Sequence, residues 1–334
     1  MLVKAFFQGA LTLFFCLGAA VAQAAGDVTL DCKKADTDTA LDFSSLNLYI
    51  SADIPPGTVL YSGKMNIALL CALNNSQNND QVELYFKRKH IEDNVPGYGL
   101  RLYTGYGGTL GTEVENIATG KMVRACDAEP FCNTITLAIP FQIVKTSAEM
   151  TAPVSSTDKV NIFDLGAETA GTDLKFYATN IHSGITVRDE TCSTMGINNL
   201  TVALGSWSLD KNGLGSGPGA TSAATAFSLT LNCEALLSGA FDVMMQFNGS
   251  AVSGLEDKGV VALTAASNAA KNVGIQLLNS EKQPVALNKP FSVASWPLSS
   301  STIKVPFYAR YYQTGQKITA GKANGLVTYT LSYQ

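Results

Sequence analysis

The chain has 334 residues, of which only 15% are charged, and 23 Lys plus Arg against 27 Asp plus Glu give a formal net charge of −4. This length predicts two domains, or one large β domain. The low charge excludes a disordered polyelectrolyte, and without clustered basic residues no nucleic-acid partner is expected.

Residues 1–24 have the form of a signal peptide. Lys4 precedes the largely apolar stretch 5–22, and Ala22-Gln23-Ala24 is a small-x-small cleavage site. A membrane anchor is the alternative, but the apolar stretch is short and no stop-transfer flank follows it. Lipidation of Cys16 is disfavoured because two phenylalanines precede it. We therefore expect an exported chain that starts at residue 25.

Six further cysteines in an oxidising compartment predict three disulfides. Two pairs are each separated by about 40 residues and the third pair is close together, which favours pairing in sequence order: Cys32–Cys71, Cys126–Cys132 and Cys192–Cys233. A zinc site is the alternative, but the chain has no Cys-x-x-Cys pair. Only two histidines are present, His90 and His182, and we expect neither a metal nor a cofactor.

Short runs rich in Val, Ile, Tyr, Phe and Thr alternate with Gly, Asn, Ser and Pro almost throughout the chain, which predicts strands. The clearest expected strands are 46–50, 82–89, 134–144, 174–181, 227–233, 241–247, 273–278 and 303–312. Many strands with regular turn signals are typical of β-sandwiches or barrels. We therefore predict an all-β protein of two β-sandwich domains, 25–183 and 184–334.

Aromatic, charged and amide side chains gather in the first half around a glycine-rich strand. Sugars bind aromatic faces and hydroxyl-binding side chains on the loops of rigid sandwiches. The best candidate ligand-binding cluster is Asp93, Asn94, Tyr98, Arg101, Tyr103 and Tyr106. Alternation predicts that Leu100 and Leu102 point inward, with Arg101 and Tyr103 on the opposite face. Packing of a sheet face is the alternative role for each aromatic residue.

Acidic residues in two further loops are weaker candidates. Cys126 and Cys132 enclose a short acidic loop that either shapes a pocket or is only a staple. Asp164, Glu168 and Asp173 offer oxygen ligands for calcium or a sugar, but their spacing departs from any calcium-loop pattern. We expect these carboxylates to be solvated.

The last residues alternate strictly. Val327, Tyr329, Leu331 and Tyr333 fall on one face of a predicted strand, and the residues between them are Thr or Ser. Such a strand is either internal to a complete sandwich or borders a groove that another chain fills.

Residues 186–334 resemble the pilin domain of chaperone–usher fimbriae. The resemblance rests on five pieces in order, besides the spacing of Cys192 and Cys233. They are Thr201-Val202-Ala203-Leu204-Gly205, Val273-Gly274-Ile275-Gln276-Leu277, Val305-Pro306-Phe307-Tyr308-Ala309-Arg310-Tyr311, Thr319-Ala320-Gly321-Lys322-Ala323-Asn324 and Thr330-Leu331-Ser332-Tyr333-Gln334.

The resemblance implies an incomplete immunoglobulin-like sandwich that lacks its seventh strand. A periplasmic chaperone, an outer-membrane usher and the donor strand of the next fimbrial subunit are then the expected partners. The expected donor-strand and chaperone groove is lined by Val327, Tyr329, Leu331, Tyr333 and Gln334, the carboxylate of Gln334 being held by the chaperone.

Only seven residues, 25–31, separate the expected cleavage site from Cys32, which is too short for a donor extension. At about 3.3 Å per residue they span roughly 23 Å. A subunit that accepts a strand but donates none belongs at the fimbrial tip, at the bacterial cell surface.

We therefore expect a fimbrial tip adhesin, not an enzyme, whose lectin-like amino-terminal domain binds a receptor glycan or glycoprotein. The segment 96–103 also resembles a Gly-x-Gly-x-Arg strand of fimbrial adhesins, although no match to a mannose-binding pocket is found. A non-adhesive capping or assembly subunit is the alternative. A secreted glycan-active enzyme is a third reading, but the chain has no catalytic motif.

Overall fold

The computed structural model describes residues 27–36, 40–89, 98–127, 131–150, 158–169, 171–188, 191–194, 199–210 and 213–334. The expected signal peptide, His90, Asp93 and Asn94 lie outside these residues. The regular elements of the described chain are strands, apart from the 3-10 turn η1, Phe43–Ser45. The all-β class is therefore confirmed. No helix in the described ranges is long and apolar enough to cross a membrane.

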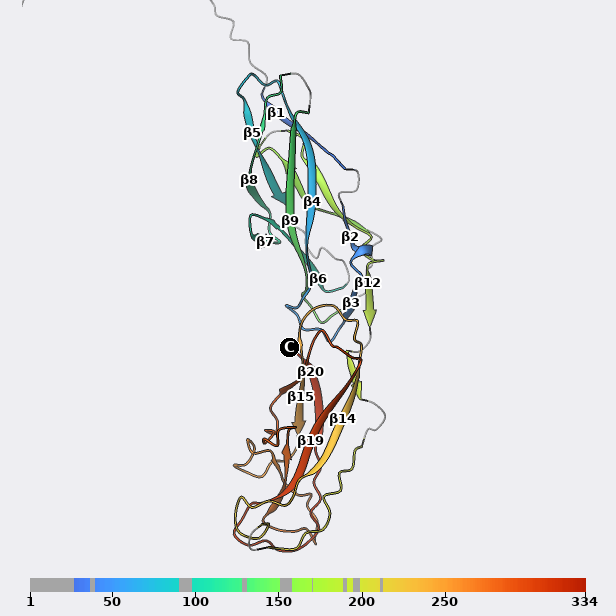
Figure 1. The fold of residues 1–334 in the computed structure, drawn as a ribbon, viewed down its shortest axis with the longest axis vertical. Helices are drawn as coiled ribbons and strands as arrows, with labels where there is room; N and C mark the ends of the chain where they lie inside the picture. The colour runs from blue at the N-terminus through green and yellow to red at the C-terminus, as the bar shows by residue number, and fades with distance from the viewer. Residues whose placement is uncertain are drawn as a thin grey trace, which may run out of the picture.

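The amino-terminal half is a sandwich of two five-stranded sheets (Figure 1). The first has the order β1 (Thr29–Lys34), β4 (Val59–Asn74), β9 (Asn133–Lys145), β6 (Leu100–Tyr106) and β7 (Thr109–Gly111). The second has the order β2 (Leu41–Asp42), β11 (Leu174–Thr179), β10 (Lys159–Gly166), β5 (Gln81–Arg88) and β8 (Glu115–Arg124).

Alternating side chains form the core of this sandwich. In β9, Ile135, Leu137, Ile139, Phe141 and Ile143 are buried, and the residues between them face outward. The strands of the second sheet contribute a row of buried aromatic rings, in which the Phe163 and Phe176 centroids lie 4.8 Å apart. Burial of one face of each sheet therefore fixes the strand registers.

One strand pair crosses the boundary expected at 183/184. The strand β12 (Ile185–Arg188) pairs in parallel with β3 (Leu48–Ser51) of the amino-terminal half. A division at 183/184 would separate β12 from its partner. Sequence could not show this, because parallel partners far apart in the chain leave no local signal.

The carboxy-terminal half is a second sandwich with unequal layers. Its larger sheet has the order β13 (Cys192–Thr194), β14 (Thr225–Cys233), β19 (Thr302–Gln313), β17 (Val273–Leu278) and β16 (Val260–Val261). Its smaller sheet has only three strands, in the order β18 (Phe291–Ser295), β15 (Asp242–Asn248) and β20 (Thr328–Tyr333).

Three disulfides join the cysteines in sequence order. Cys32 on β1 is paired with Cys71 on β4, and Cys192 on β13 is paired with Cys233 on β14. Each long bridge therefore ties the first strand of a sandwich to its neighbour. The short bridge, Cys126–Cys132, closes the loop between β8 and β9.

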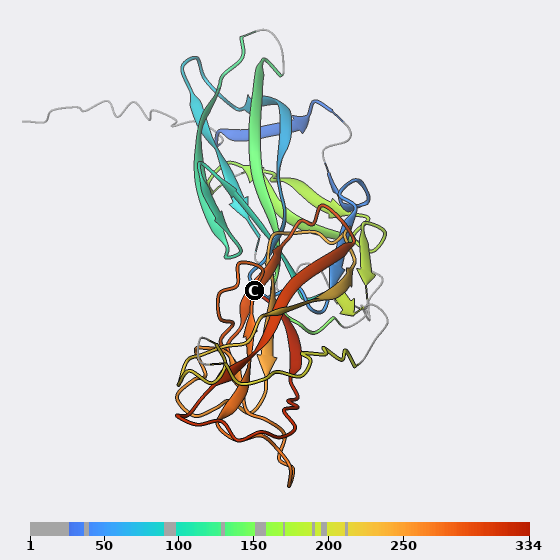
Figure 2. The same cartoon turned by 60° about the horizontal axis from the view of Figure 1, so that its bottom comes forward.

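The two sandwiches are stacked end to end (Figure 1), and both views place the carboxyl end of the chain near their junction (Figure 2). The backbone N–H of Ser238 donates to the Tyr49 carbonyl, and the N–H of Tyr49 donates to the Ser238 hydroxyl. The N–H of Thr191 donates to the carboxylate of Asp53. The halves therefore meet through specific hydrogen bonds as well as through the linking chain.

Candidate functional site

The strand β20 forms an edge of the smaller sheet. It pairs antiparallel with β15 from Val243↔Tyr333 to Asn248↔Thr328, and the described chain supplies no strand on its other side. An edge strand presents unpaired N–H and C=O groups that can pair with another chain. This edge is therefore open to a further strand.

The side chains of β20 alternate as the sequence predicts. Val327, Tyr329, Leu331 and Tyr333 are half-buried and pack against the core, whereas Thr328, Thr330 and Ser332 are exposed. None of the four apolar side chains is fully buried, although they occupy the inward face. The sandwich therefore leaves part of its apolar surface uncovered along this strand.

A second open stretch of backbone covers part of the same core. Val202 and Leu204 are half-buried and pack against it, whereas Thr201 and Ala203 are exposed. Within the described chain, the backbone of residues 199–209 makes no hydrogen bond to another backbone group. Its carbonyl oxygens accept only side-chain donors, at Leu204 from Trp207 and at Gly205 from Tyr311. In the sequence, this segment stands out only as a family motif, although its alternation indicates a half-buried face.

The carboxyl-terminal end of β20 is held in place by polar contacts. The N–H of Cys192 donates to the Tyr333 hydroxyl over 3.1 Å, and Asp242 and Gln334 exchange backbone hydrogen bonds. Gln334, the fifth groove residue expected from sequence, is exposed at this end. The strand is therefore fixed although its outer edge is open.

The ligand cluster expected from the amino-terminal half is divided between two faces. Leu100 and Leu102 are buried as expected, and Arg101 and Tyr103 are half-buried on the opposite face of β6. The Nε of Arg101 is buried without a hydrogen-bond partner in the described structure.

The two remaining described aromatics of that cluster pack inward at opposite ends of β6. The Tyr98 ring lies 6.1 Å from the His182 ring, and burial, together with the charge of Asp158, raises the pKa of Tyr98. The Tyr106 hydroxyl donates to the carbonyl of Thr119 in the opposite sheet. The structure therefore does not bring these residues into one cluster with Arg101 and Tyr103.

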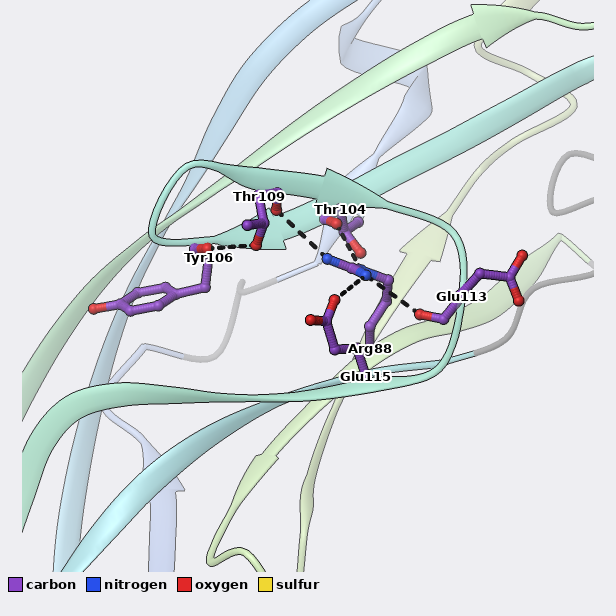
Figure 3. A network of polar contacts seen from close by, with 6 residues as sticks. All are labelled: Arg88, Thr104, Tyr106, Thr109, Glu113 and Glu115. Carbon is purple, nitrogen blue, oxygen red and sulfur yellow. Dashed lines mark hydrogen bonds and ion pairs between the residues drawn. The ribbon is translucent and has the colours of Figure 1, made fainter.

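A buried arginine that the sequence analysis did not single out lies beneath the β6–β7 hairpin (Figure 3). Arg88 is only 4% exposed, and its Nε donates to the Thr104 carbonyl over 2.9 Å. Its Nη1 lies 2.8 Å from the Glu115 carboxylate, and further donors reach the carbonyls of Glu113 and Thr109. These contacts of the Arg88 guanidinium join β5 and β8 of one sheet to the β6–β7 hairpin of the other sheet. We therefore assign Arg88 a structural role.

Two of the three later acidic residues are paired rather than solvated, whereas Glu168 is exposed as expected. Asp164 is buried and lies 2.5 Å from the Lys89 amine, and Asp173 lies 2.8 Å from the Lys87 amine. Each of these two carboxylates therefore forms an ion pair with a lysine that lies on β5 or directly after it. Among the described residues, no group of three His, Cys, Asp or Glu side chains is placed to hold a metal ion.

The carboxy-terminal half is similar to known fimbrial proteins. Residues 180–334 match the family model described as Fimbrial protein. The chain is 33% identical over 117 residues to the type-1 fimbrial protein A chain of Escherichia coli, and 38% identical over 118 residues to the C chain. Each match covers 35% of this chain and 62% of the relative.

Among solved structures, the tip adhesin CupB6 of Pseudomonas aeruginosa aligns over 91% of this chain and 95% of its own, with 16% identity and a TM-score of 0.38. Residues 180–334 of the chain are therefore similar to the fimbrial proteins.

Proposed function

We propose that this protein is the adhesive tip subunit of a chaperone–usher fimbria. Its carboxy-terminal sandwich accepts a donor strand, first from a periplasmic chaperone and then, at the outer-membrane usher, from the next subunit. Its amino-terminal sandwich binds a glycan or glycoprotein receptor. The similarity of residues 180–334 to the fimbrial family supports the first role, and the second rests on the presence of a separate sandwich in the amino-terminal half.

The proposal rests on two stretches of backbone, β20 and residues 199–209, that lie over the same core and each lack a partner strand in the described chain. The strand β20 has one strand neighbour in the described chain, and the backbone of 199–209 has no backbone partner there. A strand laid against β20 would satisfy its N–H and C=O groups and cover its half-buried side chains. Full burial of a Val, Leu or Phe-sized side chain is worth about 1.5–3 kcal/mol. The free energy gained by completing the burial of four such side chains is therefore large compared with the free energy of unfolding of a small domain.

The amino-terminal sandwich supports a receptor-binding role at the tip. Residues from Thr29 onward are built into its first sheet, where β1 is bonded to β4 and cross-linked to it by Cys32–Cys71. This part of the chain therefore cannot serve as a free donor strand. A surface with few charges suits a neutral, hydroxyl-rich target such as a glycan.

Refolding of the full chain with and without a donor peptide tests the strand-accepting role. The probe is a synthetic peptide that alternates apolar and polar residues, and the control peptide has the same composition in shuffled order. Both tryptophans, Trp207 and Trp296, lie in the carboxy-terminal half, so their fluorescence reports on that sandwich. We expect the alternating peptide alone to raise its unfolding midpoint. Reversible refolding to high stability without any peptide would contradict the proposal.

The alternative of a non-adhesive capping subunit is separated by an adhesion assay. Fimbriate cells that lack this subunit are compared with cells that carry it, at equal fimbrial number. Loss of adhesion without the subunit supports the adhesin, whereas equal adhesion favours the capping role.

A further inference from the structure

The outer face of the first amino-terminal sheet carries positive charge without a carboxylate of its own. The adjacent strands β4, β9 and β6 (Figure 1) contain no Asp or Glu. Their cations are Lys64, Lys145 and Arg101, and Lys145 is fully buried. Lys64 and Arg101 are therefore the two charges that these strands present outward.

Neither of these two cations is paired within the described chain. Lys64 is exposed, and its amine makes no hydrogen bond or ion pair with another described residue. The guanidinium of Arg101 also makes none, and its Nε is buried without a partner. Because buried polar groups are normally hydrogen-bonded, this guanidinium lacks an acceptor that a ligand can supply.

The second sheet of the same sandwich provides carboxylates for its cations. Three successive cations at the end of β5 or directly after it each lie within 2.8 Å of a carboxylate oxygen. They are Lys87 with Asp173, Arg88 with Glu115 and Lys89 with Asp164. The first sheet offers no such partner, so a carboxylate for Lys64 or Arg101 has to come from outside the described chain.

One carboxylate lies beside this face without pairing to it. Asp36, in the segment after β1, lines a hollow of about 470 Å³ together with Asn66 and small side chains of β4 and β9. Among the described contacts it forms no ion pair with Lys64. Asp36 therefore borders the face at Asn66, and the part between Lys64 and Arg101 is the part open to an anion.

The strand register sets the distance between the two cations. Arg101 pairs with Val144 of β9, and Lys64 pairs with Pro140 of the same strand. They are therefore two strand spacings of about 4.8 Å apart across the sheet and four residues of about 3.3 Å apart along it, a diagonal of roughly 16 Å. Because side chains stand roughly perpendicular to a sheet, two separate carboxylates fit these cations better than one.

The groups between the two cations suit a polypeptide. Tyr103, Gln142 and Ser62 form a row across β6, β9 and β4, and their side chains have no hydrogen-bond partner in the described structure. The Gln142 amide donates and accepts, as a peptide group does. Val144 and Pro140 are half-buried on either side of Gln142 and provide apolar contacts. Tyr103 is also half-buried, so these strands present no fully exposed ring for a sugar to lie against.

We propose that the outer face of β4, β9 and β6 binds an extended, acidic segment of a receptor polypeptide. Arg101 binds one carboxylate through its planar fork, Lys64 binds a second, and Gln142 bonds the peptide backbone between them. At about 3.3 Å per residue, a diagonal of roughly 16 Å corresponds to two acidic residues about five positions apart. This inference rests on the proposed adhesin function and assigns this face to the polypeptide part of a glycoprotein receptor.

Fluorescence anisotropy of a labelled peptide, titrated with the full chain, tests the inference. The probe is a synthetic peptide with two glutamates about five positions apart among Thr, Gly and Asn, and the control peptide has glutamine at both positions. We expect the glutamate peptide to bind about tenfold more tightly or better, with an affinity that falls as salt is added. Equal affinity for the two peptides would overturn the inference.

Matched variants locate the binding face. Arg101→Gln and Lys64→Gln remove its two cations, whereas Arg124→Gln and Lys121→Gln remove the same residue types from exposed positions of β8. We expect each of the first two variants to weaken binding of the glutamate peptide about tenfold and the β8 variants to leave it unchanged. Arg101→Lys should restore part of the affinity, because it keeps the charge and loses the fork. Equal losses from both pairs of variants would contradict the assigned face.

An acidic oligosaccharide separates the two sources of carboxylate. The probe is an oligosaccharide that contains glucuronate at regular intervals. Binding of this oligosaccharide more tightly than the glutamate peptide, with loss in Arg101→Gln and Lys64→Gln, would make the ligand a sugar and overturn the inference.

Adhesion of fimbriate cells distinguishes this inference from the proposed function. Equal adhesion with and without the subunit contradicts the adhesin, whatever the peptide binds. Adhesion that requires the subunit but persists when Arg101→Gln and Lys64→Gln are combined contradicts only this face as the receptor site.

Discussion

At the scale of single residues, the amino-terminal sandwich depends on two buried cations with different partners. Arg88 has a carboxylate and three carbonyls around its guanidinium. Lys145 is 0% exposed, and its amine has two carbonyl contacts of 3.4 Å, to Ala52 and Ile54. A buried charge is tolerated only where it is paired or hydrogen-bonded. The two residues should therefore respond differently to substitution.

Arg88→Met should destabilise the amino-terminal sandwich by about 3 kcal/mol, because it leaves the buried Thr104 carbonyl without its donor and breaks the link to the hairpin. Glu115→Gln is the matched comparison. Its side chain is 52% exposed, so its ion pair with Arg88 is screened, and the expected loss is at most about 1 kcal/mol. Urea unfolding followed by hydrogen exchange on β5 and β8 measures both. Equal losses would contradict the structural role assigned to the carbonyl contacts.

Lys145 should make the stability of this sandwich depend on pH in the alkaline range. Burial lowers the pKa of Lys145, and the charge of Asp53 opposes that effect only in part. Between the lowered pKa and the unfolded value of about 10.4, the unfolded chain binds more protons than the folded chain. The free energy of unfolding should therefore rise with pH in that window, relative to Lys145→Met. Urea unfolding at several pH values measures the slope, with Lys121→Met as a surface control. Parallel profiles for the native chain and Lys145→Met would contradict the prediction.

At the scale of single elements, β20 has one edge paired with β15 and one edge that no strand of the described chain covers. Its bonds to β15 hold it in the sheet, and its alternation gives it one apolar and one polar face. The same strand therefore offers a matched pair of neighbouring positions that differ only in the face they occupy.

Leu331→Asp should prevent acceptance of a donor strand, because it puts a charge on the half-buried face of β20. Ser332→Asp places the same charge on the exposed face, and we expect it to accept the alternating peptide normally. Tryptophan fluorescence of the carboxy-terminal sandwich, titrated with the peptide, measures both variants. Peptide-induced stabilisation of Leu331→Asp equal to that of Ser332→Asp would argue against β20 as the accepting edge.

At the scale of the whole molecule, the two sandwiches are held by a compact joint. Besides the bonds of Tyr49 and Asp53, Arg188 lies 5.4 Å from the Tyr49 ring centroid and 3.9 Å from the Glu234 carboxylate. Gly239 lies against Thr58, with an added Cβ only 2.7 Å from its methyl group. The end-to-end arrangement in Figure 1 is thus supported by side chains of both halves.

Gly239→Val should loosen this joint and leave both sandwiches folded. The added side chain clashes with Thr58 across the junction, and the positive φ of 102° is itself unfavourable for a branched residue. Gly254→Val is the control, because Gly254 also has a positive φ but nothing lies within 4 Å of its Cβ position. Small-angle scattering should show a broader distribution of interdomain distances for Gly239→Val alone. An unchanged distribution would mean that the joint does not depend on this contact.

Features with a short sequence period could be predicted from the sequence alone. The strand expected at 273–278 has these bounds in the structure, and the strand expected at 134–144 is β9 with one residue added at each end. The two faces of β20 and the inward direction of Leu100 and Leu102 follow from the same alternation. Local alternation carries this information because successive side chains of a strand point to opposite faces. The order of motifs from Thr201 to Gln334 was sufficient to suggest the fimbrial family.

Features that join distant parts of the chain were decided only by the tertiary structure. The Tyr98 ring meets His182, and the Tyr106 hydroxyl meets the Thr119 carbonyl, only because separate segments of the chain pack together. Arg88 meets its carbonyl partners, and β12 meets β3, only because separate strands pack together. The sequence by itself determined which residues form strands and which faces are apolar; packing between strands decided which side chains meet, since such contacts depend on sheet order and have no local signature.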